Sequence, residues 1–202
     1  MKTTVHYFKQ VSFVAFLILF VGSYSIGNAQ DKENAKPETE LHPEIFWDVK
    51  AYRPETTLLQ VKAVDKDGNY HDVKAIQYSE DTSLLDVKVL MNNQRLPIKL
   101  IDIKGEAFHP LKGIDLDGNL LDIVALTESG EVLEVKGVSR SGNIIHIRAI
   151  AEYGLFYNII SISSDGSIND VKGLKMLTSK VEGIINGVPI FAHVKSVQQD
   201  HI

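Results

Sequence analysis

The sequence predicts an all-β protein, an antiparallel meander of about 13 short strands built from hairpin repeats of about 24 residues. A short phrase recurs about every 12 residues from Trp47 to Val197. An aliphatic anchor is followed by a residue that is usually lysine, then by a small residue, then by a second aliphatic residue. Turn-forming residues follow alternate phrases, and no stretch has a clear helical pattern. A fixed period of this length is typical of repeat architectures. The anchors are Val49, Val61, Val73, Val87, Ile98, Leu111, Ile123, Val135, Ile147, Ile159, Val171, Val181 and Val194.

Each phrase divides into two faces, because alternate side chains of a strand point in opposite directions. One face pairs the anchor with a small residue, as Val61 with Ala63, and Val89 and Leu100 are the exceptions. We expect this face to be buried against a closely approaching neighbour. The opposite face has a basic residue in ten of the thirteen copies. The three departures are Val124, Ile160 and Glu182.

The turns indicate antiparallel hairpins. Residues 65–69 fit a three-residue hairpin loop with Gly68 in the left-handed conformation. The same pattern occurs at residues 115–119, 127–131, 139–143 and 163–167. Asn92 and Asn93 suit a two-residue loop in which both residues have positive φ.

Hairpin pairing also places opposite charges together. Within hairpins it predicts the pairs Lys62–Asp72, Asp86–Lys99 and Lys112–Asp122. Across the intervening turns it predicts the pairs Asp48–Lys62, Asp72–Lys88, Lys74–Asp86 and Asp122–Lys136. Like charges directly opposite each other in a sheet are destabilising. A parallel β-solenoid would stack lysine on lysine, so the antiparallel meander is favoured.

A flat sheet of this size would leave two long exposed edges. Sheets of many strands usually curl, close or split into two layers. We therefore expect a flattened barrel or a two-layer sandwich with a narrow core, and an open single-layer sheet is the alternative. The strands around Val49 and Val194 are the expected edges, where two copies of the chain could pair into a homo-oligomer.

The chain divides into three parts. Residues 1–29 resemble a signal peptide, with Lys2 and Lys9 before an apolar run at residues 11–21 and small residues before the expected cleavage site. The run is shorter than the roughly 20 residues of a membrane-spanning helix, so no stable span is expected after cleavage; a retained anchor is the alternative. Residues 30–45 form a polar, linker-like tail, and residues 46–202 form a single β-repeat domain.

The composition restricts partners and compartment. Of the 21 basic residues, Lys2 and Lys9 lie in the signal segment, which leaves 19 against 26 acidic residues and a formal charge of −7. This argues against a nucleic-acid partner, for which clustered positive charge supplies affinity. There is no cysteine, so an exported form has no disulfides. We expect a periplasmic, cell-surface or extracellular protein.

The phrases at residues 48–51 and 72–75, and above all the run at residues 135–147, resemble a family of uncharacterised exported β-repeat proteins of Bacteroidota-type bacteria. The likeness covers nearly all of the chain after the signal segment. It implies export and a β-rich repeat fold. It brings no assigned activity, cofactor or catalytic residue.

No metal site or other cofactor is predicted. Asp65, Asp67 and Asn69 have the spacing of the opening of an EF-hand loop, but Tyr70 and Ile76 occupy the positions that require Gly and Glu. Asp and Asn favour such turns through hydrogen bonds to their own backbone. The histidines are separated by whole hairpins, whereas a transition metal needs several converging ligands.

No catalytic residues are predicted either. The serines lie in turns without the G-x-S-x-G motif of a nucleophile elbow. The carboxylates are expected to face lysines. A nearby lysine lowers the pKa of a carboxyl group, whereas a catalytic acid needs a raised pKa. The sequence therefore favours a non-enzymatic exported binding or structural module that recognises a protein or glycan. The alternatives are a small carbohydrate-active hydrolase with a loop-borne site and a calcium-stabilised repeat protein.

The candidate binding residues are Tyr153, Phe156 and Tyr157. They gather beside Ile160, where the repeat loses its basic residue. Aromatic rings offer a large contact area to sugars or proteins. The alternative is that these rings cap one end of the core.

Overall fold

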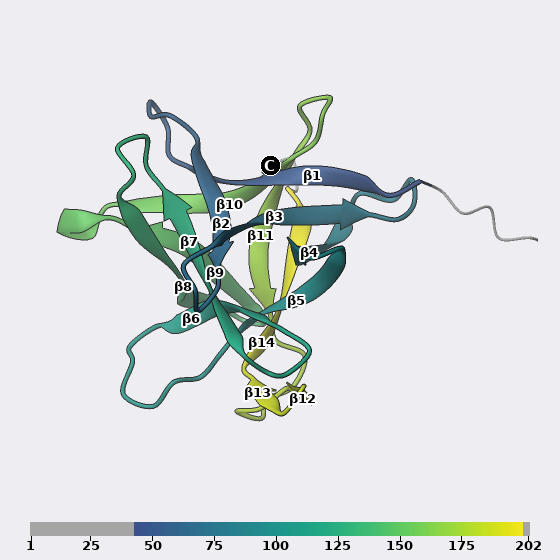
Figure 1. Cartoon of the computed structure of the whole chain (residues 1–202), viewed down its shortest axis with the longest axis vertical. Helices are drawn as coiled ribbons and strands as arrows, with labels where there is room; N and C mark the ends of the chain where they lie inside the picture. The colour runs from purple at the N-terminus through teal and green to yellow at the C-terminus, as the bar shows by residue number, and fades with distance from the viewer. Residues whose placement is uncertain (1–42, 200–202) are drawn as a thin grey trace, which may run out of the picture. The chain divides into compact units, whose positions relative to one another are not determined.

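The computed structural model describes residues 43–199, which form fourteen antiparallel strands (Figure 1). The predicted signal peptide at residues 1–29 and residues 30–42 of the predicted tail lie outside this range. The strands are β1 (Ile45–Tyr52), β2 (Leu59–Val64), β3 (Tyr70–Gln77), β4 (Leu84–Met91), β5 (Gln94–Leu100), β6 (His109–Ile114), β7 (Leu120–Leu126), β8 (Val132–Ser141), β9 (Ile144–Ile150), β10 (Phe156–Ile162), β11 (Ile168–Leu174), β12 (Gly183–Ile185), β13 (Val188–Ile190) and β14 (Ala192–Gln198). The described part has one 3₁₀ turn, η1 (Glu152–Gly154), and contains no helix long and apolar enough to cross a membrane.

Twelve strands form one sheet that closes in a ring, and β12 and β13 form a separate hairpin at the lower end of the view in Figure 1. All pairings are antiparallel, which confirms the predicted class and excludes the parallel solenoid. Closure of the ring rules out the open single-layer sheet. The ring is not an even barrel, because its strands do not simply pair with two neighbours each.

Every strand of the ring pairs with three others. Along one side it follows a single partner, in the long pairings β1–β10, β2–β7, β3–β4, β5–β6, β8–β9 and β11–β14. Along its other side, its two halves pair with two different strands. Four triangular junctions result, which we number from one to four: β1–β2–β3, β4–β5–β14, β6–β7–β8 and β9–β10–β11. Strand twist rotates neighbouring strands relative to each other, which lets one strand exchange partners along its length.

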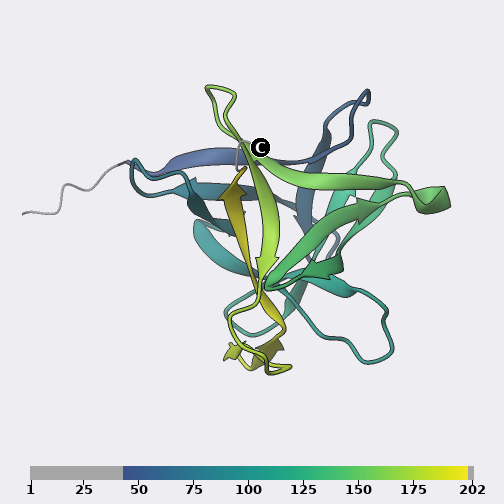
Figure 2. The same cartoon turned by 180° about the vertical axis from the view of Figure 1, so that it is seen from behind.

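The two strands predicted to be edges are not edges. β1 pairs with β10 on one side and with β2 and β3 on the other. β14 pairs in the same way with β11, β4 and β5, and β11 and β14 lie side by side in the reverse view of Figure 2. Their backbone groups are therefore used within the chain, and these strands offer no free edge for a second copy.

The interior confirms twelve of the thirteen predicted anchors, each of which is buried. The thirteenth, Val181, is wrong: it is 46% exposed and precedes β12 outside any strand. Val89 and Leu100, which replace the small residue of the buried face, pack against glycines. An ideal Cβ on Gly113 would lie 2.9 Å from Val89, and one on Gly173 would lie 2.5 Å from Leu100. Large residues thus fill the space that the glycines leave.

The predicted turns form with one exception. Gly68 has φ of +84°, and the amide of Asp65 donates to the carbonyl of Asn69 at 3.1 Å. Asn92 and Asn93 have φ of 50° and 60°, as a two-residue turn requires. The predicted loop at residues 139–143 is wrong, because β8 continues to Ser141. A bulge after Gly137 absorbs the extra residue, and a two-residue turn follows.

Two of the three charge pairs predicted within hairpins form, and the third, Asp86–Lys99, does not. Lys62 contacts Asp72 at 2.6 Å, and Lys112 contacts Asp122. The other predicted pairs do not form in the register, because the strands exchange partners at the junctions. Instead, the long pairings align the basic positions with each other, as in Lys74–Lys88, Lys99–Lys112, Lys136–Arg148 and Lys172–Lys195.

This alignment explains two departures from the basic pattern. Val124 lies opposite Lys62, and Ile160 lies opposite Lys50, each in a long pairing. An apolar residue at one member of the pair removes a like-charge contact. Both apolar side chains are buried although they belong to the outer face.

Candidate functional site

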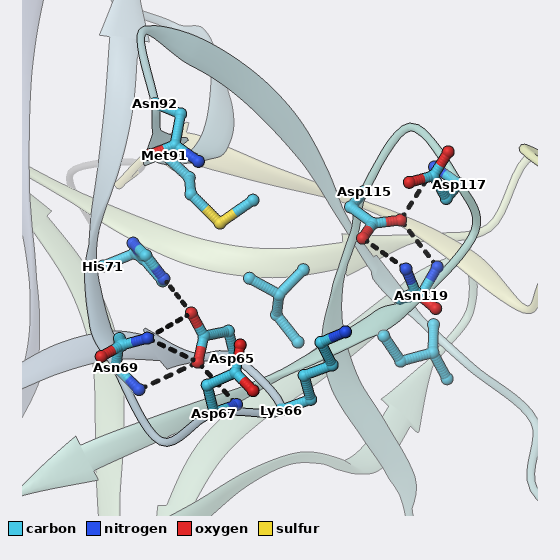
Figure 3. A pocket seen from close by; sticks show the side chains of 12 residues that line it. Asp65, Lys66, Asp67, Asn69, His71, Met91, Asn92, Asp115, Asp117 and Asn119 are labelled. Atoms are coloured by element: carbon cyan, nitrogen blue, oxygen red, sulfur yellow. Dashed lines mark hydrogen bonds and ion pairs between the residues drawn. The ribbon is translucent and has the colours of Figure 1, made fainter.

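A cleft of ≈ 590 Å³ lies between two hairpin turns that are distant in sequence. Residues 65–69 between β2 and β3 form one wall, and residues 115–119 between β6 and β7 form the other. Met91 and Asn92 contribute from the turn between β4 and β5. Figure 3 shows the two turns on opposite sides of the cleft, with the Lys66 side chain extending between them.

The two walls are built alike. Asp65 Oδ1 accepts hydrogen bonds from the backbone amides of Asp67 and Asn69, both at 2.9 Å. Asp115 Oδ1 accepts the equivalent bonds from Asp117 and Asn119 at 2.9 and 2.7 Å. Each asparagine amide also donates to its aspartate. Short side chains with this bonding hold the backbone in a turn, so the first aspartate of each wall is structural.

His71 extends the first wall. Its Nε2 lies 2.9 Å from Asp65 Oδ2, and its side chain is mostly buried. The hydrogen bond from His71 and those from Asn69 lower the pKa of Asp65 below its ordinary value. Burial acts to raise the pKa of Asp115, but the hydrogen bonds from Asn119 outweigh it and leave that pKa lowered. Both carboxylates are therefore ionised at neutral pH.

The remaining acids of the cleft have no such partners. Asp67 and Asp117 are exposed, and within residues 43–199 neither carboxylate accepts a hydrogen bond or forms an ion pair within 4.0 Å. The expectation that each carboxylate faces a lysine is wrong here, because these residues lie in turns and not in strands. The cleft thus presents two free carboxylates to solvent, one on each wall.

The β12–β13 hairpin supports the second wall. Asn186 Nδ2 donates to the carbonyl of Asp115 at 2.6 Å, and a Cβ on Gly118 would lie 2.3 Å from the Asn186 carbonyl oxygen. Ile190 is buried with Ile114 and Ile101 beneath the hairpin. The position of the wall therefore depends on a segment some 70 residues away.

A buried lysine holds this hairpin in place. Lys175 is 2% exposed, and its Nζ donates to Glu182 Oε1 at 3.2 Å and to the Phe191 carbonyl at 3.0 Å. The amine also lies 4.3 Å from the centre of the Phe191 ring. His109 begins β6, and its ring stacks on the Phe191 ring with 3.6 Å between the ring centres. Sequence reasoning missed this cluster because its members lie in separate, non-repeating segments.

The structure does not bring the three predicted aromatic residues together. Tyr153 is 95% exposed in η1, with φ of 58°. Phe156 lies on the outer face, with the Arg148 guanidinium 5.9 Å from its ring centre. Tyr157 packs against the core. Phe156 and Tyr157 therefore face opposite sides of β10, and the capping alternative describes Tyr157 best.

The described residues also bear on metal binding. Asp65 and Asp115 use their oxygens to accept hydrogen bonds within their turns, as the reading of the Asp-x-Asp-x-Asn motif as a turn implies. Among residues 43–199, no group of three or more His, Asp or Glu side chains is arranged to hold a metal ion.

A protein-family model matches nearly all of the residues that the structure describes. The family model of DUF7486, described as a family of unknown function, matches residues 43–197. The chain belongs to DUF7486. No curated protein and no solved structure matches it.

The DUF7486 region contains both walls of the cleft, the supporting hairpin and every strand of the ring except the last residue of β14. The two Asp-x-Asp-Gly-Asn turns are the sequence signal for the cleft, since they alone share this motif. Their spacing along the chain does not indicate that they face each other. That placement depends on the long pairing of β2 with β7.

Proposed function

We propose that this DUF7486 domain is a non-enzymatic binding module, and that its cleft between residues 65–69 and 115–119 receives a cationic segment of a protein partner. One observation carries the proposal: Asp67 and Asp117 present two carboxylates without basic partners to one cleft. With Asp65 and Asp115 also ionised, Lys66 is the single lysine or arginine that lines the cleft among residues 43–199. The cleft is therefore negative, and a lysine or arginine side chain would find charge and hydrogen-bond acceptors there.

Binding is better supported than hydrolysis. A glycoside hydrolase needs one carboxyl group with a raised pKa in a desolvated setting. Asp67 and Asp117 are both exposed, so neither has that desolvated setting. Within residues 43–199, no serine lines the cleft as a nucleophile. The His71–Asp65 pair supports the turn in the first wall and adds no second reacting group.

The exposed ring of Tyr153 supports a second contact, with a glycan or with the same partner. An aromatic side chain that is 95% exposed offers a large contact area at little entropic cost. The Arg148 guanidinium lies over the ring of Phe156, so we restrict this second candidate to Tyr153. Loss of binding to a glycan array in Tyr153→Ala, with unchanged unfolding, is the result expected.

We also propose that the domain is exported to the periplasm or cell surface, as the predicted signal peptide and the absence of cysteine support. A fusion of residues 1–42 to a reporter that is active only after export tests this part independently of the cleft.

The cleft is tested with labelled hexalysine and hexaarginine peptides by fluorescence anisotropy. The double substitution Asp67→Asn and Asp117→Asn removes two charges from the cleft, and we expect at least about a tenfold loss of affinity. The control is Glu128→Gln with Glu131→Gln, which removes the same charge from the turn between β7 and β8. Affinity in the control should stay within about twofold. An equal loss in both variants would assign binding to net charge and overturn the proposal.

A further inference from the structure

The four junctions share one arrangement on their outer face, which makes them comparable. Each strand of the ring has one basic position, the outward-facing residue that follows its anchor. At each junction this residue lies opposite a residue of a second strand, and that residue comes two places before the second strand's own basic position. At the first junction, two of these three pairs are ion pairs, Lys62–Asp72 and Lys74–Asp48. The third is Lys50 opposite Gln60. Acids there nearly balance the lysines.

The second junction, β4–β5–β14, has the largest excess of positive charge. Its three pairs are Lys88 with Pro97, Lys99 with His193, and Lys195 with Asp86. Asp86 is the single acid, and it contacts both Lys195 and Lys88, the latter at 3.5 Å. The third and fourth junctions each have an apolar residue, Val124 or Ile160, at one basic position. Only the second junction has lysine at all three basic positions and a single acid opposite them.

Lys99 is the amine left without a counter-charge. Within residues 43–199, no carboxylate lies within 4.0 Å of it, and its Nζ contacts His193 Nδ1 at 3.1 Å. An ammonium group has three donors, so two remain for another ligand. Burial, with Lys88 and Lys195 nearby, lowers the pKa of Lys99 to about 8. Burial and Lys99 likewise lower the pKa of His193.

The surrounding strands add to this positive charge. Each lysine of the junction faces another lysine across a long pairing, in the pairs Lys88–Lys74, Lys99–Lys112 and Lys195–Lys172. The three lysines outside the junction each form an ion pair, in the pairs Lys74–Asp48, Lys112–Asp122 and Lys172–Asp170. Like charges directly opposite each other cost stability, and no other junction has three such pairs. The sheet therefore holds an arrangement that an added anion would stabilise.

We propose that the outer face of the second junction binds a tetrahedral oxyanion, the phosphate or sulfate group of a free ion or of an ester. Lys99 is the principal ligand, and Lys88 and Lys195 stand beside it. The oxyanion supplies the missing counter-charge and accepts the free hydrogen bonds of Lys99. Hydrogen bonds between charged groups of this kind are about twice as strong as neutral ones.

The test is titration of the purified protein with sodium sulfate, sodium phosphate and a monosaccharide 6-sulfate at constant ionic strength, followed by amide chemical shifts in NMR spectra. Sulfate should shift amides of β4, β5 and β14. Equal affinity for sulfate and its ester assigns the site to the free ion, and tighter binding of the ester assigns it to a sulfated sugar; both support the oxyanion. Shifts spread over all four junctions would overturn it.

Three variants locate the site. Lys99→Met should weaken sulfate binding by about tenfold or more, whereas Lys99→Arg keeps the charge and should stay within about threefold. The matched control is Lys62→Met, which removes the equivalent lysine of the first junction. Equal weakening in Lys62→Met would show general surface charge and refute the assignment. Urea unfolding of each variant confirms that it is folded.

The pH dependence separates a ligand from a bystander. Sulfate keeps its charge across the range, so the affinity of the native protein should fall as the pH rises through about 8, where Lys99 loses its proton. Lys99→Arg stays charged and should lose this step. A step that persists in Lys99→Arg would mean that another group controls binding.

Discussion

Gly173 offers the sharpest test of how the interior is packed. It lies in β11 and faces inward, where an added Cβ would lie 2.5 Å from Leu100 Cδ1 and 3.0 Å from Ile145 Cβ. The leucine terminus can move, but the Ile145 Cβ is fixed by its backbone. Overpacking of a core costs about 1–3 kcal/mol, and replacing a strand glycine returns about 0.5–1 kcal/mol. We therefore expect Gly173→Ala to destabilise the fold by about 0.5–2 kcal/mol.

Urea unfolding followed by circular dichroism measures this change. Gly183→Ala is the control, because nothing lies within 4 Å of a Cβ there, and it should be neutral or slightly stabilising. Leu100→Ala alone should cost about 2–5 kcal/mol. The double variant with Gly173→Ala should cost about 1 kcal/mol less than the sum, because the new methyl group gains space. Additive costs, or a Gly173→Ala protein as stable as the native one, would refute the close contact.

Three further predictions concern single side chains. Lys175→Met should cost about 1–3 kcal/mol by leaving the Phe191 carbonyl without its donor, whereas Lys180→Met, at an exposed ion pair, should change the urea midpoint little. Asn92→Ala should cost about 1 kcal/mol, because alanine is disfavoured at positive φ; an unchanged midpoint would contradict this. The unfolded chain keeps the Lys99 proton up to about pH 10.4, and the folded chain releases it near 8, so native stability should rise across that window. In chloride buffer at pH 7, the Lys99→Met variant should have a larger free energy of unfolding than the native protein. This difference should shrink by pH 10, and a constant difference would exclude the lowered pKa of Lys99.

The class of the fold and much of its local geometry follow from the sequence alone. Strand periodicity identifies the buried face, and Val49 or Ile98 is buried because the pattern places it beside other aliphatic residues. Gly68 and the Asn92–Asn93 pair predict their turns, because left-handed backbone conformations favour these residues. Within hairpins, the register and pairs such as Lys62–Asp72 follow from loop length.

The candidate site was only partly visible in the sequence. The Asp-x-Asp-Gly-Asn motifs at residues 65–69 and 115–119 are readable as turns, and their first aspartates as backbone acceptors. That Asp67 and Asp117 share a cleft is not readable, because it needs β2 beside β7. Phe156 and Tyr157 are neighbours in the sequence but face opposite sides of the sheet, since adjacent residues of a strand point in opposite directions.

The antiparallel strands, the buried anchors and the hairpin turns follow from the amino-acid sequence, because they depend on residues close along the chain. The long pairings and the junctions of three strands depend on the tertiary structure. Each long pairing joins equivalent phrases, so the pattern of one phrase cannot specify its partner. Closure of the ring fixes that choice. In the closed ring Leu100 packs into the space left by Gly173, and Lys99 faces Lys112 while no carboxylate of residues 43–199 lies within 4.0 Å of Lys99.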